Sequence, residues 1–299
     1  MIHGIINVYK EKGFTSHDVV AKLRGIVGQK KIGHTGTLDP DATGVLPVCL
    51  GKATKICDLL TDKNKTYEAV LLLGKTTDTQ DITGEVLEEK STEALTEEKV
   101  REAIEGFIGD YEQIPPMYSA LKVNGKKLYE LAREGKVIER KTRPVKILDI
   151  QILEIDLPKV RMEVSCSKGT YIRTLCHDIG EKLGCGGCME SLIRTRVSTF
   201  RIEDAKMLDE IETLKQEGKL AELLVPIDAM FPSYPKITVK DDWKAFAKNG
   251  NPLDLKMLKE ACGQDEETQV RLYDESGKFI AIYQWKEKKY HIVKMFFNE

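Results

Sequence analysis

The sequence lacks the long apolar segments of a membrane protein. None of its apolar runs approaches the ~20 residues that a membrane-spanning helix needs. Its first residues also lack a basic stretch followed by an apolar one, which is the pattern of a secretory signal. We therefore expect a cytoplasmic protein with no membrane partner.

The cysteine content does not indicate a disulfide framework or a complete metal site. The seven cysteines are odd in number and scattered along the chain, which is typical of reduced thiols. Cys185 and Cys188 have the spacing of half a zinc site, but the sequence holds no second pair of this kind to supply four ligands. A glycine-rich turn explains the two residues better. We expect neither a metal nor a cofactor.

The chain also lacks an overall excess of positive charge, since its net charge is −2. Nine Lys or Arg and three Glu nevertheless fall between Lys122 and Lys146, a local balance of +6. Such a run is most often a solvated face, but the neighbouring Tyr118 and Tyr129 favour a surface for RNA. Its charge and its glycine and proline residues argue against a stably packed element without a partner.

The hydrophobic pattern predicts an α+β fold. Apolar residues run or alternate as in strands over residues 65–75 and 159–166. They recur at helical spacing over residues 19–27, over residues 100–108 and after Thr170. At 299 residues, one large and one small domain are the expected organisation.

The most informative stretch runs from Gly33 to Gly44. It holds three glycines, three threonines and one proline, and it follows neither a helical nor a strand period, so it predicts an ordered loop. Pro40 keeps Asp39 out of the α region, and glycine lets backbone approach a ligand closely. From the residues alone, two interpretations are open: an Asx turn with threonine caps, or a positioned catalytic carboxylate.

This loop resembles the catalytic motif of the TruB family of tRNA pseudouridine synthases. Three further segments match that family in the same order along the chain, at residues 65–69, 169–175 and 192–197. The resemblance implies an isomerase that converts uridine 55 in the T-loop of tRNA into pseudouridine. It also implies the pseudouridine synthase catalytic fold, a mixed and largely antiparallel sheet flanked by helices.

The resemblance implies a division of the chain as well. Residues 1–232 would form the catalytic domain, with a mobile RNA-clamping insertion at about 117–146. Residues 233–299 would form a small β-rich, PUA-like RNA-binding domain, and three prolines between Pro226 and Pro235 suit a boundary there. We expect tRNA as the partner and no obligate protein partner. A non-catalytic tRNA-binding or tRNA-folding protein is the alternative.

The chemistry requires few residues. The uracil N1–C1′ bond breaks, the base turns while it is held, and C5 joins C1′. The reaction therefore needs one nucleophilic carboxylate, a base or aromatic group to manage a proton, and a pocket that retains the detached uracil. A glycoside hydrolase would instead need two facing carboxylates, and Asp41 is too close to Asp39 along the chain to face it. Arg173, near a predicted helix start, opposes the helix dipole, and a partner carboxylate would explain its position.

The resemblance assigns roles residue by residue. It makes Asp39 the nucleophile, Arg173 its ion-pair partner, and Tyr67 the aromatic ring that stacks on the flipped uracil and manages a proton. Five further positions match the family's substrate pocket: His34, Lys55, Asp81, Tyr171 and Leu192.

Overall fold

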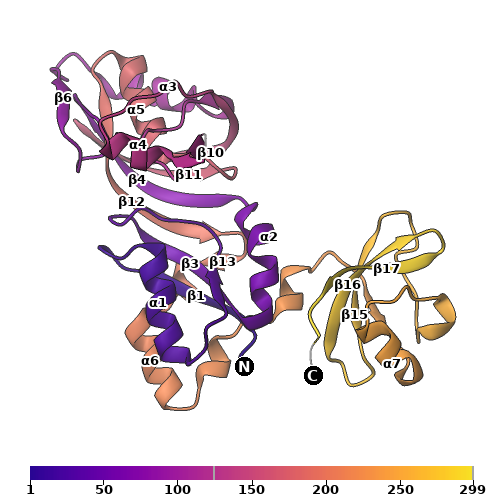
Figure 1. The fold of residues 1–299 in the computed structure, drawn as a ribbon. Coiled ribbons are helices and arrows are strands. Elements are labelled where there is room, and N and C mark those ends of the chain that lie inside the picture. The colour runs from indigo at the N-terminus through magenta and orange to yellow at the C-terminus, as the bar shows by residue number, and fades with distance from the viewer. Residues whose placement is uncertain (124, 298–299) are drawn as a thin grey trace. The chain divides into compact units, whose positions relative to one another are not determined.

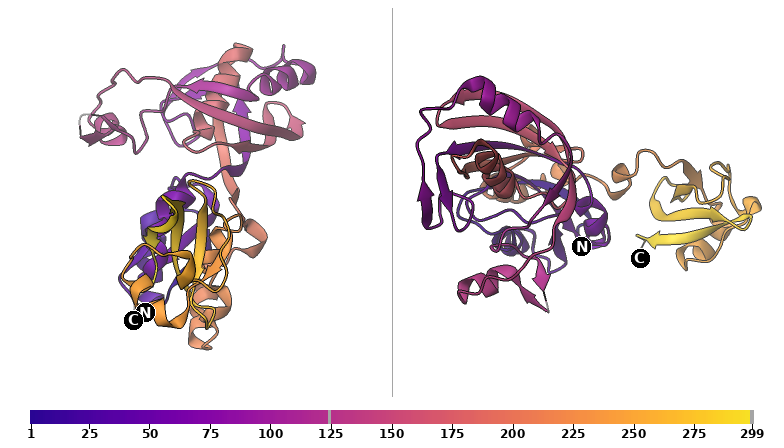
Figure 2. Two further views of the ribbon diagram at one scale, coloured as in Figure 1. Left: turned by 90° about the vertical axis from the view of Figure 1, so that its right-hand side faces the viewer. Right: turned by 90° about the horizontal axis from the view of Figure 1, so that it is seen from above.

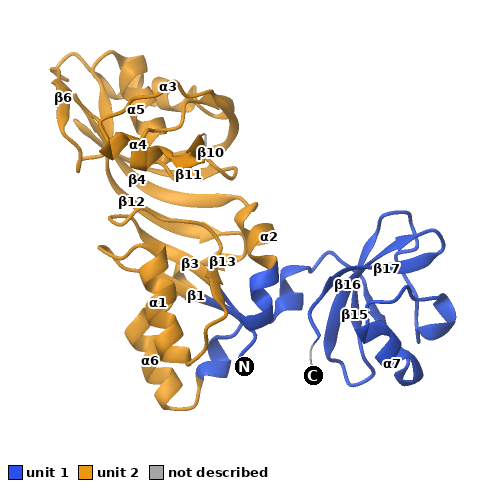
Figure 3. Cartoon of the chain, in the orientation of Figure 1, with its two compact units in different colours: residues 1–6, 49–55, 220–299 blue, residues 7–48, 56–219 orange. Residues whose placement is uncertain are grey.

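The computed structural model describes residues 1–123 and 125–297. Contacts divide it into two compact units (Figure 3): unit 1 holds residues 1–6, 49–55 and 220–299, and unit 2 holds residues 7–48 and 56–219. The domain boundary expected after residue 232 stays a prediction, because compactness alone does not locate the end of an independently folding domain. No helix in the described ranges has the length and apolar content of a membrane crossing.

A large sheet forms the centre of unit 2 (Figure 1). Its strand order is β1-β3-β12-β4-β11-β10-β7, with β2 paired to β3 and β13 paired to β12. From β12 to β7 all neighbours are antiparallel, whereas β3 pairs with β12 in parallel. The expected mixed, largely antiparallel sheet is therefore confirmed. The strands are β1 (Gly4–Lys10), β2 (Ile32–His34), β3 (Thr43–Leu50), β4 (Lys65–Leu73), β7 (Gly109–Gln113), β10 (Arg143–Asp156), β11 (Lys159–Cys166), β12 (Gly187–Val197) and β13 (Phe200–Arg201).

Helices flank this sheet, as Figures 1 and 2 show. The helix α5 packs against β12 and β4, α3 packs beside α5 and against β10, and α1 lies beside α6. The α-helices of unit 2 are α1 (Ser16–Val27), α2 (Cys57–Thr61), α3 (Glu97–Glu105), α4 (Leu128–Arg133), α5 (Ile172–Leu183) and α6 (Leu208–Gln216). A two-stranded sheet, β5 (Lys75–Thr77) with β6 (Val86–Glu89), completes the unit's regular structure together with a short hairpin described below.

Buried and half-buried side chains alternate along β4, which shows which face of the sheet is in the core. In β4 the side chains at Tyr67, Ala69, Leu71 and Leu73 are buried, whereas those between them are half-buried. Successive side chains of a strand point to opposite faces, so the buried series joins the core beneath α3 and α5. Tyr67 is thereby turned toward the side of the sheet on which α5 begins.

The helix expected over residues 100–108 is shorter at its C-terminal end. It ends at Glu105, because Gly106 caps it with its N–H bonded to the carbonyls of Glu102 and Ile104. Ile108 lies beyond that end and its side chain is 44% exposed, so its predicted place on the buried face was wrong. Glycine has a low helix propensity, which favours termination there.

The basic segment, residues 117–146, contains more local structure than its charge indicated. Strands β8 (Lys122–Val123) and β9 (Lys126–Lys127) form a hairpin that leads directly into α4. The backbone N–H of Lys127 donates to a Glu130 carboxylate oxygen over 3.0 Å, and Leu128 is buried. One capping bond and one buried leucine thus stabilise a short helix within a charged segment.

Unit 1 contains its own small sheet, in agreement with the expected β-rich C-terminal region. The strands β14 (Lys236–Thr238), β15 (Gln269–Tyr273), β16 (Phe279–Lys286) and β17 (Lys289–Met295) lie in that order. The first pair is parallel and the others are antiparallel. The helix α7 (Asp241–Lys248) follows β14, and a separate hydrophobic core forms around buried Tyr283 and Tyr290.

Candidate functional site

The loop from Gly33 to Gly44 connects β2 to β3 and is fixed on both sides of Asp39. The Leu38 N–H donates to Ser16 Oγ over 2.9 Å, and Leu38 itself is buried. Ala42, on the other side, is also buried, and its N–H donates to the Asp39 carbonyl over 3.1 Å. The Asp39 side chain, by contrast, is 45% exposed. The loop therefore presents the Asp39 carboxylate to solvent between two buried neighbours.

A buried lysine stabilises the same turn. Lys10, at the end of β1, is fully buried, and its Nζ donates to the carbonyls of Pro40 over 3.0 Å and Ala42 over 2.6 Å. A third bond, of 3.1 Å, goes to the Glu11 carbonyl. The three ammonium protons are thus matched by three carbonyl oxygens.

The pKa of Lys10 predicts how the free energy of unfolding changes with pH. Burial lowers the pKa of Lys10 from 10.5 to about 8, with the neighbouring Asp39 and Asp41 acting in the opposite direction. Between these values the unfolded chain binds more protons than the folded one, so this residue makes stability rise with pH. In Lys10→Met that rise is absent. The free energy of unfolding of the wild type, measured in denaturant from pH 7.5 to 10.5, should increase relative to that of the variant.

At pH 7.5 the same variant should lose about 1–3 kcal/mol of stability, because buried carbonyls lose their donor. Lys12→Met is the matched control, since the Lys12 side chain is 73% exposed and lies 4.0 Å from Asp41. If the free energies of unfolding of the wild type and of Lys10→Met changed equally with pH, the lowered pKa of Lys10 would be contradicted.

Arg173 approaches Asp39 from the first turn of α5. Its Nε lies 3.0 Å from Asp39 Oδ2, and its side chain is only 6% exposed. The helix start is held by Gln113, whose Oε1 accepts from the Tyr171 N–H over 2.8 Å and whose Nε2 donates to the Tyr171 carbonyl over 2.9 Å. The expected contact between Asp39 and Arg173 is therefore present, and their catalytic roles remain a prediction.

The remaining nitrogens of Arg173 are also occupied. Its Nη1 donates to the Thr79 carbonyl over 3.0 Å, and its Nη2 donates to the Tyr118 carbonyl over 2.8 Å. Asp81 Oδ2 lies 3.7 Å from Nη1, while Asp81 Oδ1 accepts from the Thr83 N–H over 3.0 Å. These acceptors fix the plane of the guanidinium, and the plane in turn orients the Asp39 carboxylate.

Tyr67 lies opposite Arg194 in the β4–β12 pair. Arg194 is fully buried, and its Nε donates to the Val45 carbonyl over 2.8 Å and its Nη2 to the Gly36 carbonyl over 3.3 Å. Burial raises the pKa of Tyr67 to about 12, while the charge of Arg194 opposes that shift. Tyr67 is therefore a neutral phenol near pH 7.

Arg194 has no predicted role, although the sequence carried a signal that its side chain is buried. Residues two apart in a strand share a face, so buried Leu192 on β12 indicated that Arg194 points inward as well. Arg194 also explains a glycine of the loop. Gly44 has φ +104°, and a Cβ built there would lie 2.3 Å from the Arg194 carbonyl, so this position requires glycine.

The other expected pocket residues lie in different places. His34 is half-buried, its Nδ1 accepts from the Gly36 N–H over 3.3 Å, and its ring packs edge-on against His17. Burial lowers its pKa, which keeps the imidazole neutral near pH 7. Leu192 shares the core cluster of Tyr67. Lys55 belongs to unit 1, where its Nζ donates to the Met295 carbonyl over 2.7 Å.

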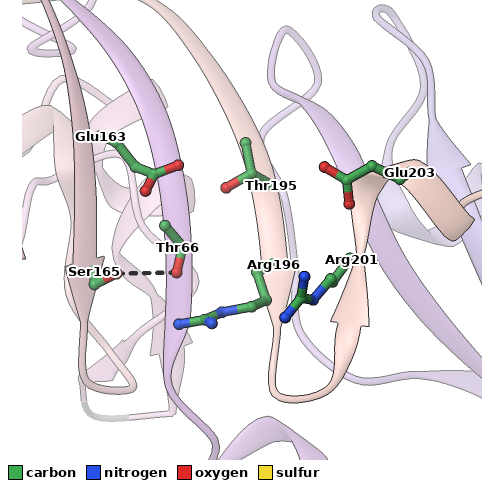
Figure 4. A pocket seen from close by; sticks show the side chains of 7 residues that line it. All are labelled: Thr66, Glu163, Ser165, Thr195, Arg196, Arg201 and Glu203. Atoms are coloured by element: carbon green, nitrogen blue, oxygen red, sulfur yellow. Dashed lines mark hydrogen bonds between the residues drawn. The ribbon is translucent and has the colours of Figure 1, made fainter. Parts of the chain in front are cut away.

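A separate pocket of about 230 Å³ opens on the opposite face of the sheet (Figure 4). Thr66, which lines it, directly precedes Tyr67 in β4 and therefore points the other way. Two arginines and two glutamates line this pocket, so its charges balance: Arg196, Arg201, Glu163 and Glu203. It is not part of the site around Asp39 and does not have the positive charge that an RNA backbone favours.

Among the described residues no cluster of three His, Cys, Asp or Glu side chains has the arrangement of a metal site. The thiols of Cys185 and Cys188 are both buried. The absence of a metal and of a cofactor from the reaction stays a prediction. What the geometry provides is an oriented carboxylate, a neutral phenol and a buried leucine, Leu192, in the same core cluster as that phenol.

Comparison with protein families gives two matches. The TruB family pseudouridylate synthase N-terminal domain matches residues 24–172, and the tRNA pseudouridylate synthase B C-terminal domain matches residues 173–232. Among curated proteins, tRNA pseudouridine synthase B of Lachnoclostridium phytofermentans is 58% identical, over 99% of this chain and 100% of that protein. The protein of the same name from Alkaliphilus oremlandii is 47% identical, over 96% of this chain and 91% of its own length.

Solved structures give the same fold. A chain in the structure of an H/ACA RNP bound to a substrate RNA containing 2′-deoxyuridine is 26% identical, with a TM-score of 0.73 over 99% of this chain and 85% of that one. A chain in a Cbf5-Nop10-Gar1 complex is 29% identical, with a TM-score of 0.72 over 98% of this chain and 85% of that one.

Proposed function

Because the chain belongs to the TruB family of pseudouridylate synthases and is therefore an isomerase, we propose that it converts uridine 55 in the T-loop of tRNA into pseudouridine with Asp39 as the nucleophile. Family membership favours this activity over the alternative of a protein that only binds RNA. One observation carries the residue assignment: the partly exposed Asp39 carboxylate lies 3.0 Å from the buried Arg173 guanidinium.

The proposed reaction rearranges bonds within one nucleotide. The N1–C1′ bond breaks, the uracil turns while it is held, C5 joins C1′, C5 loses a proton and N1 gains one. Asp39 would attack either C1′ or the base, and both routes need an ionised carboxylate held in one orientation. Arg173 contacts Oδ2, which leaves Oδ1 for the substrate.

The substrate base is stacked in tRNA and must be extruded, at an expense of a few kcal/mol. The apolar surface of Leu192 and the ring of Tyr67 would receive the flipped uracil, and His34 would occupy the space it leaves. With a pKa of about 12, Tyr67 holds the base mainly as a neutral phenol. Proton removal by Tyr67 would depend on the adjacent Arg194 charge, which favours the phenolate.

The basic segment, residues 117–146, would bind the tRNA backbone. Its balance of charge between Lys122 and Lys146 is +6, and phosphate contacts of this kind position an RNA without reading its sequence. The Tyr118 carbonyl at its start also accepts a bond from Arg173. The segment proposed to bind RNA is thus one hydrogen bond away from Arg173, the ion-pair partner of Asp39.

The test uses an unmodified tRNA transcript incubated with the purified chain alone. We expect pseudouridine at position 55 and nowhere else, mapped by reverse-transcription stops after carbodiimide treatment. A transcript with cytidine at position 55 is the control and should stay unmodified. Pseudouridine at another position would contradict the assigned target, and no product at all would contradict the absence of an obligate protein partner.

A further inference from the structure

Tyr118 connects the start of the basic segment to a second loop beside the catalytic residues. Its carbonyl accepts from Arg173 Nη2 over 2.8 Å, and its hydroxyl donates to Asp78 Oδ2 over 3.3 Å. The other oxygen of that carboxylate, Asp78 Oδ1, accepts from the Glu85 N–H over 2.8 Å. One residue therefore contacts both Arg173 and the loop of residues 78–85.

That loop holds the other edge of Arg173. It supplies the Thr79 carbonyl at 3.0 Å from Nη1 and the Asp81 carboxylate at 3.7 Å. The guanidinium is thus held between two chain segments, by the Tyr118 carbonyl from one and by the Thr79 carbonyl and the Asp81 carboxylate from the other. The bond from Tyr118 to Asp78 joins these segments directly and sets the distance between their acceptors.

From this arrangement we propose that Tyr118 is a positioning residue: its hydroxyl bond to Asp78 fixes Arg173, and through Arg173 it aims the Asp39 carboxylate when RNA holds the basic segment. The inference rests on the proposed function, in which Asp39 is the nucleophile. It connects the basic segment, residues 117–146, to the Asp39 carboxylate through Tyr118 and Arg173. Tyr118 itself need not touch the substrate.

The hydrogen bond from Tyr118 to Asp78 is longer than most bonds between a hydroxyl and an oxygen. Hydroxyl–oxygen bonds are usually about 2.7–2.8 Å long, so the 3.3 Å separation between Tyr118 Oη and Asp78 Oδ2 has room to shorten. Hydrogen bonds that matter for catalysis are often long before the substrate binds. A displacement of about 1 Å at a reacting group can lower a rate about 10²-fold. Loss of one hydroxyl, with the Tyr118 carbonyl retained, should have a smaller effect.

The first experiment compares Tyr118→Phe with the wild type on full-length tRNA. We expect the single-turnover rate constant at saturating enzyme to fall about 10-fold, while the tRNA Kd from filter binding stays within about twofold because no charge is lost. An unchanged rate constant overturns the proposal. So does a weaker Kd with an unchanged rate constant, because Tyr118 would then be an RNA contact.

Tyr111→Phe is the matched control. The Tyr111 hydroxyl also donates to a carboxylate, that of Asp178 on α5, but it contacts no acceptor of Arg173. Its rate constant should equal that of the wild type. An equal loss of rate in the control would mean that any tyrosine–aspartate bond near α5 has this effect, and the proposal would fail.

A second set of variants tests the bond itself. Asp78→Asn can keep both contacts, with its amide oxygen accepting from the Glu85 N–H and its amide N–H donating to Tyr118 Oη, and should retain most of the rate. Asp78→Ala loses the Glu85 bond as well and should lose at least as much as Tyr118→Phe. If the two residues act through one bond, the double variant Tyr118→Phe/Asp78→Ala loses no more than Asp78→Ala alone. Independent, multiplicative losses would refute the link. Asp39→Asn, assayed in parallel, separates this outcome from failure of the proposed function.

Discussion

Asp39→Asn should abolish isomerisation of uridine while tRNA binding persists. Asparagine keeps the shape of the side chain but removes its charge and its nucleophilicity, so we expect the rate to fall by a factor on the order of 10³ or more. Binding should change little, because the proposed phosphate contacts lie in the basic segment, residues 117–146. Tritium release from tRNA labelled at C5 of uridine measures the rate, and filter binding measures the affinity.

Asp41→Asn is the matched control for this prediction. Asp41 lies in the same loop, its side chain is 57% exposed, and its nearest cation is Lys12 at 4.0 Å. It should react at nearly the wild-type rate. Turnover by Asp39→Asn close to that of the wild type would show that the nucleophile is another residue.

Arg173→Lys should lower the single-turnover rate constant about 10²-fold, because a displaced reacting group loses about that much. Lysine keeps the positive charge but cannot contact Asp39, Thr79 and Tyr118 at once, as the planar guanidinium does. The Asp39 carboxylate would then lose its fixed orientation. Stability should also fall by about 1–3 kcal/mol, because buried carbonyl oxygens lose their donors.

Arg161→Lys is a suitable control, since Arg161 is 43% exposed and pairs with Glu68 and Glu154 on the sheet surface. Its rate and stability should stay near those of the wild type, as exposed ion pairs contribute little. A rate constant for Arg173→Lys equal to that of the wild type would refute the orienting role of the guanidinium.

The sequence predicted the ordered loop around Asp39, and its resemblance to the TruB family predicted the Asp39–Arg173 contact. It did not identify Lys10 or Arg194, the two buried cations that hold the loop. Each lies two residues from an apolar strand residue, which indicated an inward side chain, but most of the carbonyl oxygens that accept from them belong to distant segments that no pattern in the sequence connects. The role of Lys55 stays a prediction, since it contacts Met295 in unit 1.

Local structure was predicted less well where tertiary contacts decide it. The helix end at Glu105 depends on one glycine cap, and α4 depends on the burial of Leu128 and a bond to Glu130. Periodicity averages over several residues, so it does not register single contacts of this kind. The hydrogen bond from Tyr118 to Asp78 could not be predicted for the same reason, because the two residues are 40 positions apart in the sequence and belong to no motif.

The parallel pairing of β3 with β12 has a consequence for folding. In the described part of the chain, two residue pairs join β3 to β12: Thr43 with Ile193 and Gly44 with Arg194. The bond from Arg194 to the Val45 carbonyl closes a loop of 149 residues, and contacts of such separation form slowly because much chain entropy must first be lost. The antiparallel strands β10 and β11 are close neighbours in sequence and can pair early. The proposed site around Asp39 is therefore completed late in folding, when two sheet segments that lie far apart in the sequence meet.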